Sequence, residues 1–266
     1  MPVKVALLIP AAGASTRFSG KIKKQFAELD GRAVFLRTVE LFADRDDVVQ
    51  IVMAIPAEDE EIFKIRHEAS LGFHGVKVIL GAKHRFETVE KLLQQVKDDV
   101  DLIALHDAVR PCVTKKQIDA VFAAAAQTGA AILAHRLVGT IKKVDTQNHI
   151  ETTIDRSTLW EAQTPQVFKP DIIKKAYQQR EKIRENITDD AQLVEALGVL
   201  VKIVESTPSN IKITTNEDLA VAAAILKARP SPNPKAPPAP GPANKAGKIS
   251  DPDYSHDFET SQVTFL

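Results

Sequence analysis

Small residues and two cations follow the first apolar run of the chain and could bind phosphate. Pro10-Ala11-Ala12-Gly13-Ala14 come directly after that run, and Arg17 and Lys24 stand further along. Successive backbone N–H groups in such a loop can cradle phosphate oxygens, and fixed cations stabilise the charge that develops during phosphoryl transfer. Taken alone, the loop is equally consistent with a tight strand-to-helix turn that carries two solvated cations.

This loop matches neither common glycine-rich fingerprint. A Walker A loop ends in Gly-Lys-Ser/Thr, and a Rossmann loop has three spaced glycines. Gly13 is the single glycine in residues 10–18. The remaining signal is therefore a small-residue loop followed by cations.

A carboxylate ends another apolar run. Asp107 follows Leu102–His106 and stands before Arg110 and Pro111. At the carboxyl end of a buried strand, Asp107 is well placed to hold phosphate-bound Mg²⁺, directly or through water. Arg110 would favour the ionised carboxylate and could also reach an acceptor phosphate. The alternative is a buried Asp–Arg ion pair that closes the turn before Pro111.

The order of apolar and amphipathic runs predicts the elements that would position these side chains. Continuous apolar runs predict strands at 3–9, 49–55, 76–80, 102–106, 130–134, 201–204 and 211–213. Amphipathic runs predict helices near 34–43, 59–69, 86–96, 116–128, 171–182 and 189–197. This alternation implies an α/β fold with a mostly parallel sheet covered on both faces. Such sheets bind ligands in the loops at the carboxyl ends of their strands.

Two segments break the alternation. Residues 139–161 contain two polar, β-branched stretches around Asp145–His149, which predicts a hairpin arm. An arm cannot bury both of its faces alone, so packing against a second subunit is plausible. Eight of the fifteen prolines lie in 230–252, a composition that cannot form a packed core. We therefore expect a domain over 1–228 and a Pro-rich, disordered tail over 229–266.

Composition restricts the class of protein. The 35 basic and 35 acidic residues balance, so the chain lacks the broad positive field that captures nucleic acid or an anionic membrane. Cys112 is the single cysteine, which excludes an intrachain disulfide and a metal site of several thiolates and fits a reducing, cytoplasmic setting. The apolar start is too short for a membrane span and lacks the pattern of a secretory signal.

Several motifs resemble those of the 2-C-methyl-D-erythritol 4-phosphate cytidylyltransferases and of the related ribitol 5-phosphate cytidylyltransferases. Residues 11–17 are similar to the family's Ala-Ala-Gly-x-x-x-Arg loop, and 106–111 to its His-Asp-Ala-x-Arg-Pro motif. Residues 156–166 resemble its Arg-x-x-Leu-Trp-x-x-Gln-Thr-Pro-Gln run, and 210–214 its Asn-Ile-Lys-Val/Ile-Thr. A weaker match, 81–89, could by itself be a helix start. The resemblance covers about residues 3–227.

The chain departs from the family pattern at five positions. Ser15 and Ala82 replace glycines, Lys23 replaces a proline, Thr88 replaces a serine, and Gly139 replaces an aspartate. None of these changes removes a cation. Ala82 adds a Cβ to the backbone that, by the resemblance, meets the base, and Gly139 lacks the carboxylate of the family's aspartate.

The resemblance implies a three-layer Rossmann-like nucleotidyltransferase fold, a mostly parallel sheet with a protruding β-hairpin arm. Carried over residue by residue, it implies these catalytic residues: Arg17, Lys24, Arg156 and Lys212. The implied nucleotide-binding residues are Pro10, Ala11, Ala12, Gly13, Ala14, Gly81, Ala82, Arg85, Thr88, Asp107 and Ala108. The implied acceptor-binding residues are Asp107, Arg110, Thr140, Arg156, Thr164, Thr188 and Lys212, with Asp107 also the metal ligand. Thr188 is equally suited to be a helix N-cap.

The activity implied by the resemblance is cytidylyl transfer from CTP to 2-C-methyl-D-erythritol 4-phosphate, with Mg²⁺ or another divalent cation. The reaction releases pyrophosphate and forms 4-diphosphocytidyl-2-C-methyl-D-erythritol for non-mevalonate isoprenoid synthesis. A homodimer through the 139–161 arm is implied, and neither nucleic acid nor membrane is an expected partner. Two alternatives stay open: ribitol 5-phosphate as the acceptor, or a non-catalytic nucleotide-binding interaction protein whose tail recruits a partner.

Overall fold

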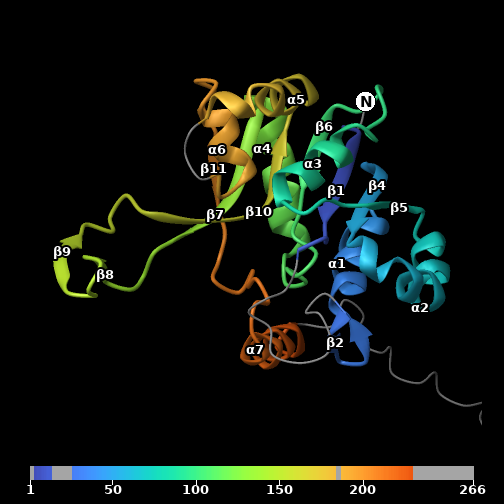
Figure 1. Ribbon diagram of the computed structural model, residues 1–266, viewed down its shortest axis with the longest axis horizontal. Helices are drawn as coiled ribbons and strands as arrows, with labels where there is room; N and C mark the ends of the chain where they lie inside the picture. Colours follow the sequence, from blue (N-terminus) through green and yellow to red (C-terminus); the bar gives the residue numbers. More distant parts are fainter. Residues whose placement is uncertain (1–2, 14–25, 184–186, 230–266) are drawn as a thin grey trace, which may run out of the picture. The chain divides into compact units, whose positions relative to one another are not determined.

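Seven strands form one sheet in the computed structural model (Figure 1). The structure describes residues 3–13, 26–183 and 187–229. The sheet has the order β11-β7-β10-β6-β1-β4-β5. Its strands are β1 (Val5–Pro10), β4 (Val48–Ile55), β5 (Val76–Leu80), β6 (Leu102–Leu105), β7 (Ala130–Arg136), β10 (Trp160–Phe168) and β11 (Lys202–Glu205).

Only β10 runs against its neighbours in this sheet, since it pairs antiparallel with both β6 and β7. The other pairings in the sheet are parallel. The amino end of β10 therefore shares one edge of the sheet with the carboxyl ends of β1, β4, β5, β6 and β7. Ligands of open α/β sheets bind at that edge.

Helices cover both faces of the sheet because the central strands are apolar on both sides. Val5, Leu7 and Ile9 of β1 belong to one core cluster, and Ala6 and Leu8 to another. The first cluster includes side chains of α1 (Val34–Ala43), α2 (Glu60–Phe73) and α4 (Lys115–Thr128). The second includes side chains of α3 (Arg85–Leu93), α5 (Pro170–Gln178) and α6 (Asp190–Glu195). The predicted three-layer α/β fold is confirmed.

A smaller cluster lies near the functional edge. It joins α7 (Asn216–Lys227) to the short hairpin of β2 (Glu28–Leu29) and β3 (Arg32–Ala33) through Leu29, Val34, Val109, Cys112, Ile213 and Ala222. The helix begins with a capping box, in which Thr215 and Asp218 bond each other's backbone N–H groups. This cluster fixes the chain on both sides of Lys212.

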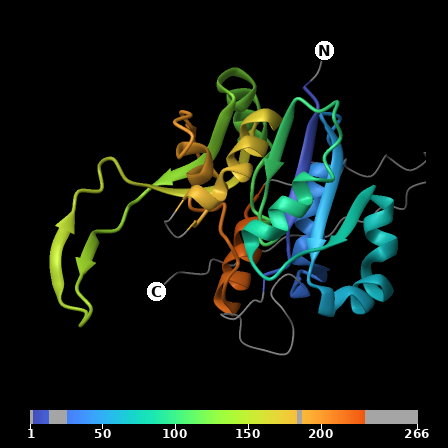
Figure 2. The same ribbon diagram turned by 45° about the horizontal axis from the view of Figure 1, so that its top comes forward.

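The predicted arm is present as a hairpin. It consists of β8 (Ile141–Val144) and β9 (Ile150–Ile154), which pair antiparallel and lie away from the main sheet in both views (Figures 1 and 2). Val138, Val144 and Ile150 are exposed. The arm therefore has apolar side chains that the described part of this chain does not cover.

The predicted strand at 211–213 is wrong. These residues lie outside the sheet and form one backbone bond to the turn after β6, from the Ile213 N–H to the carbonyl of Val109. The side chains of Ile211 and Ile213 pack in the α7 cluster instead. Strand β10 was not predicted, because three buried polar residues interrupt its pattern. Among the described residues, no helix has the length and apolar character needed to cross a membrane.

Candidate functional site

A buried carboxylate with two cations lies at the carboxyl end of β6. Asp107 follows the buried strand and its side chain is 10% exposed. One of its oxygens, Oδ2, lies 2.9 Å from Nζ of Lys212 and 3.2 Å from Nε of Arg110. Arg110 also donates from Nη1 to the carbonyl of Asn210 at 2.8 Å. The chain thus brings together three of the predicted site residues from segments a hundred residues apart.

These charges keep Asp107 ionised. Burial alone would raise the pKa of its carboxyl group, but the charges of Lys212, Arg85 and Arg110 and the hydrogen bond from Lys212 outweigh burial. The pKa of Asp107 therefore lies far below its ordinary value. A carboxylate that stays charged in a low-dielectric site attracts cations and orients the guanidinium and ammonium groups beside it.

Two small-residue loops meet at the same edge. Ala11, after β1, donates its N–H to the carbonyl of Ala54 at 2.8 Å, and Gly81, after β5, donates to the neighbouring Ile55 at 2.8 Å. A Cβ on Gly81 would lie 2.4 Å from the Cβ of Ala12. Glycine is required at residue 81 because the two loops touch. Both predicted nucleotide loops are thus hydrogen-bonded to adjacent residues of β4.

Thr88 holds the second loop in shape. Its hydroxyl accepts the N–H of Ala82 at 2.9 Å and reaches the carbonyl of His84 at 3.1 Å, and the residue is 1% exposed. The Cβ of Ala82 is accommodated here without loss of that bond. The side chain of Thr88 therefore orders the loop.

Arg85 is fixed by an acidic partner that sequence reasoning missed. Its guanidinium forms a bidentate pair with the fully buried Asp190, at 2.9 and 2.6 Å, and Tyr177 donates to the same carboxylate at 2.5 Å. Burial would lower the pKa of Arg85, but the charge of Asp190 raises it, so Arg85 stays charged. This pair ties the start of α3 to α6.

The predicted acceptor residue Thr164 is hydrogen-bonded to the backbone of Asp107. Its hydroxyl accepts the backbone N–H of Asp107 at 3.0 Å and lies 3.0 Å from Nδ1 of His106. Thr164 stands where the pairing of β10 with β7 is interrupted, between Ala162 and Gln166. Such irregularities re-aim side chains near functional sites. Here the interruption lies where the Thr164 hydroxyl meets the residues that follow β6.

The remaining predicted residues lie around this edge. Thr140 and Arg156 are exposed at the base of the arm, where Arg156 bonds the carbonyl of Val138. Thr188 is exposed and bonds Gln192, whereas the N-cap of α6 is Asp189, so the N-cap prediction for Thr188 is wrong. Pro10 ends β1, whereas Gly13 and Ala108 lie three residues after the ends of β1 and β6. Arg17, Lys24 and Ala14 lie outside the described residues.

Several buried polar residues support the site and were missed. His106, Gln163, Gln166, Asp190 and Asn210 are each at most 2% exposed. Asn210 donates to the side chain of Gln163 at 3.1 Å and to the carbonyl of Thr164 at 3.0 Å. The sequence does offer one signal for such a residue, which is a polar side chain at the end of or within an apolar run. His106 after Leu102–Leu105 is an example.

The site can accept a metal that arrives with phosphates. No group of three or more His, Cys, Asp and Glu side chains in the described part of the chain could hold a metal ion alone. Asp107 is a single ionised carboxylate, and Mg²⁺ is commonly bound by one or two carboxylates together with substrate phosphates. The donor set therefore fits a phosphate-bound Mg²⁺ and not a protein-enclosed metal.

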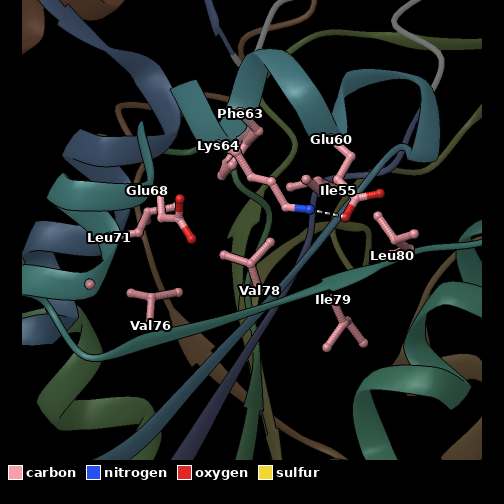
Figure 3. Close-up of a pocket in the computed structure, with 11 residues that line it drawn as sticks. Ile55, Glu60, Phe63, Lys64, Glu68, Leu71, Val76, Val78, Ile79 and Leu80 are labelled. Carbon is pink, nitrogen blue, oxygen red and sulfur yellow. Dashed lines mark hydrogen bonds and ion pairs between the residues drawn. The ribbon is translucent and has the colours of Figure 1, made fainter. Parts of the chain in front are cut away.

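A separate pocket lies under α2 and over β5 (Figure 3). Its volume is about 340 Å³, and it is lined mainly by apolar side chains, including Phe63, Leu71 and Val78. Lys64 and Glu60 form an ion pair at its side. None of the predicted site residues within the described ranges lines it, so it is distinct from the edge described above.

Comparisons with known proteins identify relatives of this chain. The family model for 2-C-methyl-D-erythritol 4-phosphate cytidylyltransferase matches residues 5–228. The protein of that name from Endomicrobium trichonymphae is 40% identical over 225 residues, covering 85% of this chain and all of the relative. The one from Rhodopirellula baltica is 40% identical and covers 84% of this chain and 94% of the relative.

Solved structures show the same likeness. The crystal structure of 2-C-methyl-D-erythritol 4-phosphate cytidylyltransferase from Thermus thermophilus aligns with a TM-score of 0.69 at 29% identity, over 85% of this chain and all of that one. A 4-diphosphocytidyl-2C-methyl-D-erythritol synthase from Anaerococcus prevotii aligns with a TM-score of 0.73 at 26% identity, over 85% of this chain and 97% of that one. With the sheet, the paired loops and the Asp107 cluster in place, this chain belongs to the 2-C-methyl-D-erythritol 4-phosphate cytidylyltransferase family.

Proposed function

We propose that this chain transfers the cytidylyl group of CTP to 2-C-methyl-D-erythritol 4-phosphate and releases pyrophosphate. The observation that carries the proposal is the Asp107 cluster at the sheet edge, in a chain 40% identical to a relative with that name. The product is 4-diphosphocytidyl-2-C-methyl-D-erythritol. The chain therefore supplies an intermediate of non-mevalonate isoprenoid synthesis.

In this reaction an oxygen of the acceptor's phosphate attacks the α-phosphorus of CTP in line. A new P–O bond forms, the bond to the β-phosphate oxygen breaks, and pyrophosphate takes its electron pair. A phosphate oxygen is already anionic at neutral pH, so a general base is unnecessary. The main requirement is to hold two anions together and to stabilise the charge of the transition state.

Basic side chains would meet that requirement from two sides. Arg17 and Lys24, which follow β1 in the sequence, would contact the triphosphate. Lys212 and Arg156 would hold the acceptor's phosphate, and Arg110 would orient Asp107. Lys212 supports this role because its side chain, 37% exposed, has access both to Asp107 and to solvent. Thr140 and Thr188, both exposed, would contact the acceptor.

Asp107 would hold Mg²⁺, or another divalent cation, on the phosphates of CTP. When bound, the metal offsets phosphate charge and polarises the reacting phosphoryl group. The role of the chain is to keep Asp107 ionised and correctly directed, which the positions of Lys212 and Arg110 support.

A homodimer and a cytoplasmic location complete the proposal. The arm exposes Val144 and Ile150, as the chain does Val138 just before it, and a two-stranded hairpin is marginally stable unless it packs against another surface. We propose that the arm, with Arg156 at its base, packs on a second copy and brings Arg156 to that copy's acceptor site. Balanced charge and a single cysteine suit the cytoplasm.

The test is pyrophosphate release measured with each of the four nucleoside triphosphates. Each triphosphate is combined with 2-C-methyl-D-erythritol 4-phosphate, with ribitol 5-phosphate, or with no acceptor. We expect release with CTP and the methylerythritol acceptor only. Equal or faster release with ribitol 5-phosphate would reassign the acceptor. Binding of CTP without release under any condition would identify a non-catalytic protein.

A further inference from the structure

Lys212 stands in a segment, residues 206–215, that forms neither helix nor strand and joins β11 to α7. Backbone bonds tie this segment to the sheet edge at two points. The Ser206 N–H bonds a carbonyl of β7 at 2.7 Å, and the Ile213 N–H bonds the turn after β6 at 2.9 Å. Because no regular structure fixes the residues between these points, side chains must do so.

Two buried amide side chains hold the middle of this segment. Asn210, two residues before Lys212, is fully buried, and Gln163 of β10 is 2% exposed. Nδ2 of Asn210 donates to Oε1 of Gln163 at 3.1 Å and to the carbonyl of Thr164 at 3.0 Å. Nε2 of Gln163 donates to the carbonyl of Thr207 at 3.1 Å, which also accepts the Asn210 N–H at 3.1 Å. The amide pair thus binds the turn from Thr207 to Asn210 to β10.

The orientation of both amides follows from their partners. A backbone carbonyl can only accept, so Asn210 presents its NH₂ group to Thr164, and Gln163 presents its own to Thr207. Oε1 of Gln163 is therefore the acceptor for Asn210. The second hydrogen of Gln163 has Nδ1 of His135 as acceptor, at 3.1 Å. All four amide hydrogens of the pair are used, so neither amide can flip without losing bonds.

The backbone of Asn210 connects this pair to the charged cluster. Its carbonyl accepts from Nη1 of Arg110 at 2.8 Å, and Nε of Arg110 lies 3.2 Å from Oδ2 of Asp107. Nζ of Lys212 lies 2.9 Å from the same oxygen. The place of Asn210 therefore decides where the next residues of the segment, Lys212 among them, meet Asp107.

We propose that Asn210 and Gln163 are positioning residues, whose amide pair fixes the segment from β11 to α7 so that Lys212 lies beside Asp107. The inference rests on the proposed function, in which Lys212 holds the acceptor's phosphate. A displacement of about 1 Å among positioned groups can lower a rate about 100-fold. Loss of the pair should therefore affect the use of the acceptor much more than the binding of CTP.

Two substitutions break the pair with little change in size. Asn210→Leu removes both side-chain donors of Asn210, and Gln163→Leu removes its acceptor together with the donor to the turn. Gln50→Leu is the matched control. The amide of Gln50 also bonds two backbone groups, the carbonyl of Gln95 at 2.7 Å and the N–H of Lys97 at 3.0 Å, but it lies at the amino end of β4. Each variant is assayed with CTP and 2-C-methyl-D-erythritol 4-phosphate varied in turn, and unfolding midpoints are recorded.

We expect Asn210→Leu and Gln163→Leu each to lower kcat/KM for the acceptor about 10–100-fold, with KM for CTP changed by less than about threefold. Gln50→Leu should lower the unfolding midpoint and leave both kinetic values unchanged. A double-mutant cycle tests whether Asn210 acts through Lys212. In a Lys212→Met background, the loss caused by Asn210→Leu should be at least about fivefold smaller than in the wild type, because the side chain that Asn210 positions is gone.

A second readout does not depend on turnover. Acetylation of lysines by acetic anhydride is followed by peptide mass spectrometry in the absence of substrates. Lys64 of α2, paired with Glu60 at 2.7 Å, is the internal reference. We expect Lys212 to react at least about twofold faster in Asn210→Leu than in the wild type, because an amine released from its ion pair is more available. The rate for Lys64 should not change. If Asn210→Leu does not fold, Gln163→Leu takes its place in the cycle and in the labelling.

Any one of three results in a folded variant would overturn the proposal. These are an unchanged kcat/KM for the acceptor, a loss of the same size with and without Lys212, and an unchanged rate of Lys212 acetylation. An inactive wild type would contradict the proposed function, whereas the labelling would still show whether the amide pair holds Lys212 in place. An active wild type with any of the three results would refute the positioning role alone.

Discussion

Replacing Gly81 by alanine tests the contact between the two nucleotide loops. The added Cβ would lie 2.4 Å from the Cβ of Ala12, and 3.1 and 3.2 Å from side-chain atoms of Thr88. Carbon atoms pack best at about 3.5–4.0 Å, so one loop must move by about 1 Å. Neither moves easily, because Gly81 and the residue before Ala12 are each bonded to β4 at 2.8 Å.

We expect Gly81→Ala to lower both stability and turnover. Overpacking of this kind costs about 1–3 kcal/mol, and each kcal/mol lowers the unfolding midpoint of a domain of this size by about 2–4 °C. A displacement of about 1 Å among positioned reactants can lower the rate about 100-fold. The assay is kcat/KM for CTP at fixed acceptor, together with thermal unfolding.

Two companion variants make the test specific. Gly81→Ala combined with Ala12→Gly removes the closest contact and should recover part of kcat/KM, since only the two contacts to Thr88 remain. Gly72→Ala is the matched control, because a Cβ there meets nothing within 4 Å. Wild-type kcat/KM and midpoint in Gly81→Ala would refute the reasoning, as would a double variant no better than the single one.

Four further outcomes are expected. Lys24→Ala should lower kcat about 10²–10³-fold with the unfolding midpoint preserved; unchanged turnover would exclude the role given to Lys24. Dimers inactivated at Arg156, mixed with dimers inactivated at Lys24, should regain activity on subunit exchange, and no recovery would count against an exchanged arm. Asp190→Asn should destabilise the fold by about 1–3 kcal/mol in urea unfolding, because it removes the charge that pairs with Arg85; wild-type stability would show that this pair is not needed. Cys112, fully buried, has its thiol pKa raised by burial to about 11, so a thiol reagent at neutral pH should modify it only as fast as the protein opens, and rapid modification of the folded protein would contradict its burial.

Much of the fold could be predicted because the sheet is covered on both faces. Strands β1, β4, β6 and β7 each contain a continuous apolar run of at least four residues, a pattern that the sequence displays directly. Strand β10 escaped prediction because Gln163, Thr164 and Gln166 are buried within it. A polar residue in a sequence predicts an exposed position unless the groups that hydrogen-bond to it are known. Here those groups lie on other elements.

The site was predictable where a single segment carries the signal. The turn from Asp107 to Arg110 is one such segment, and its ion pair is present. The pairing of Arg85 with Asp190 joins residues 105 positions apart, so no local pattern could reveal it. The predicted strand at 211–213 failed for a related reason, since its apolar residues pack on α7 and no spacing distinguishes that packing from a sheet.

Because of where the arm begins and ends, its sequence can change without a change in the main sheet. The pairing of β7 with β10 in the main sheet ends just before the arm. Arg136 lies opposite Trp160, and the Leu137 N–H donates to the Leu159 carbonyl. Loop length costs little free energy, about 0.6 kcal/mol for each doubling. Residues 141–154 can therefore be lengthened, trimmed or exchanged while the strand ends beside Asp107 keep their register. Changes in the length and sequence of the arm can thus leave the main sheet and the Asp107 turn intact, by engineering or by descent.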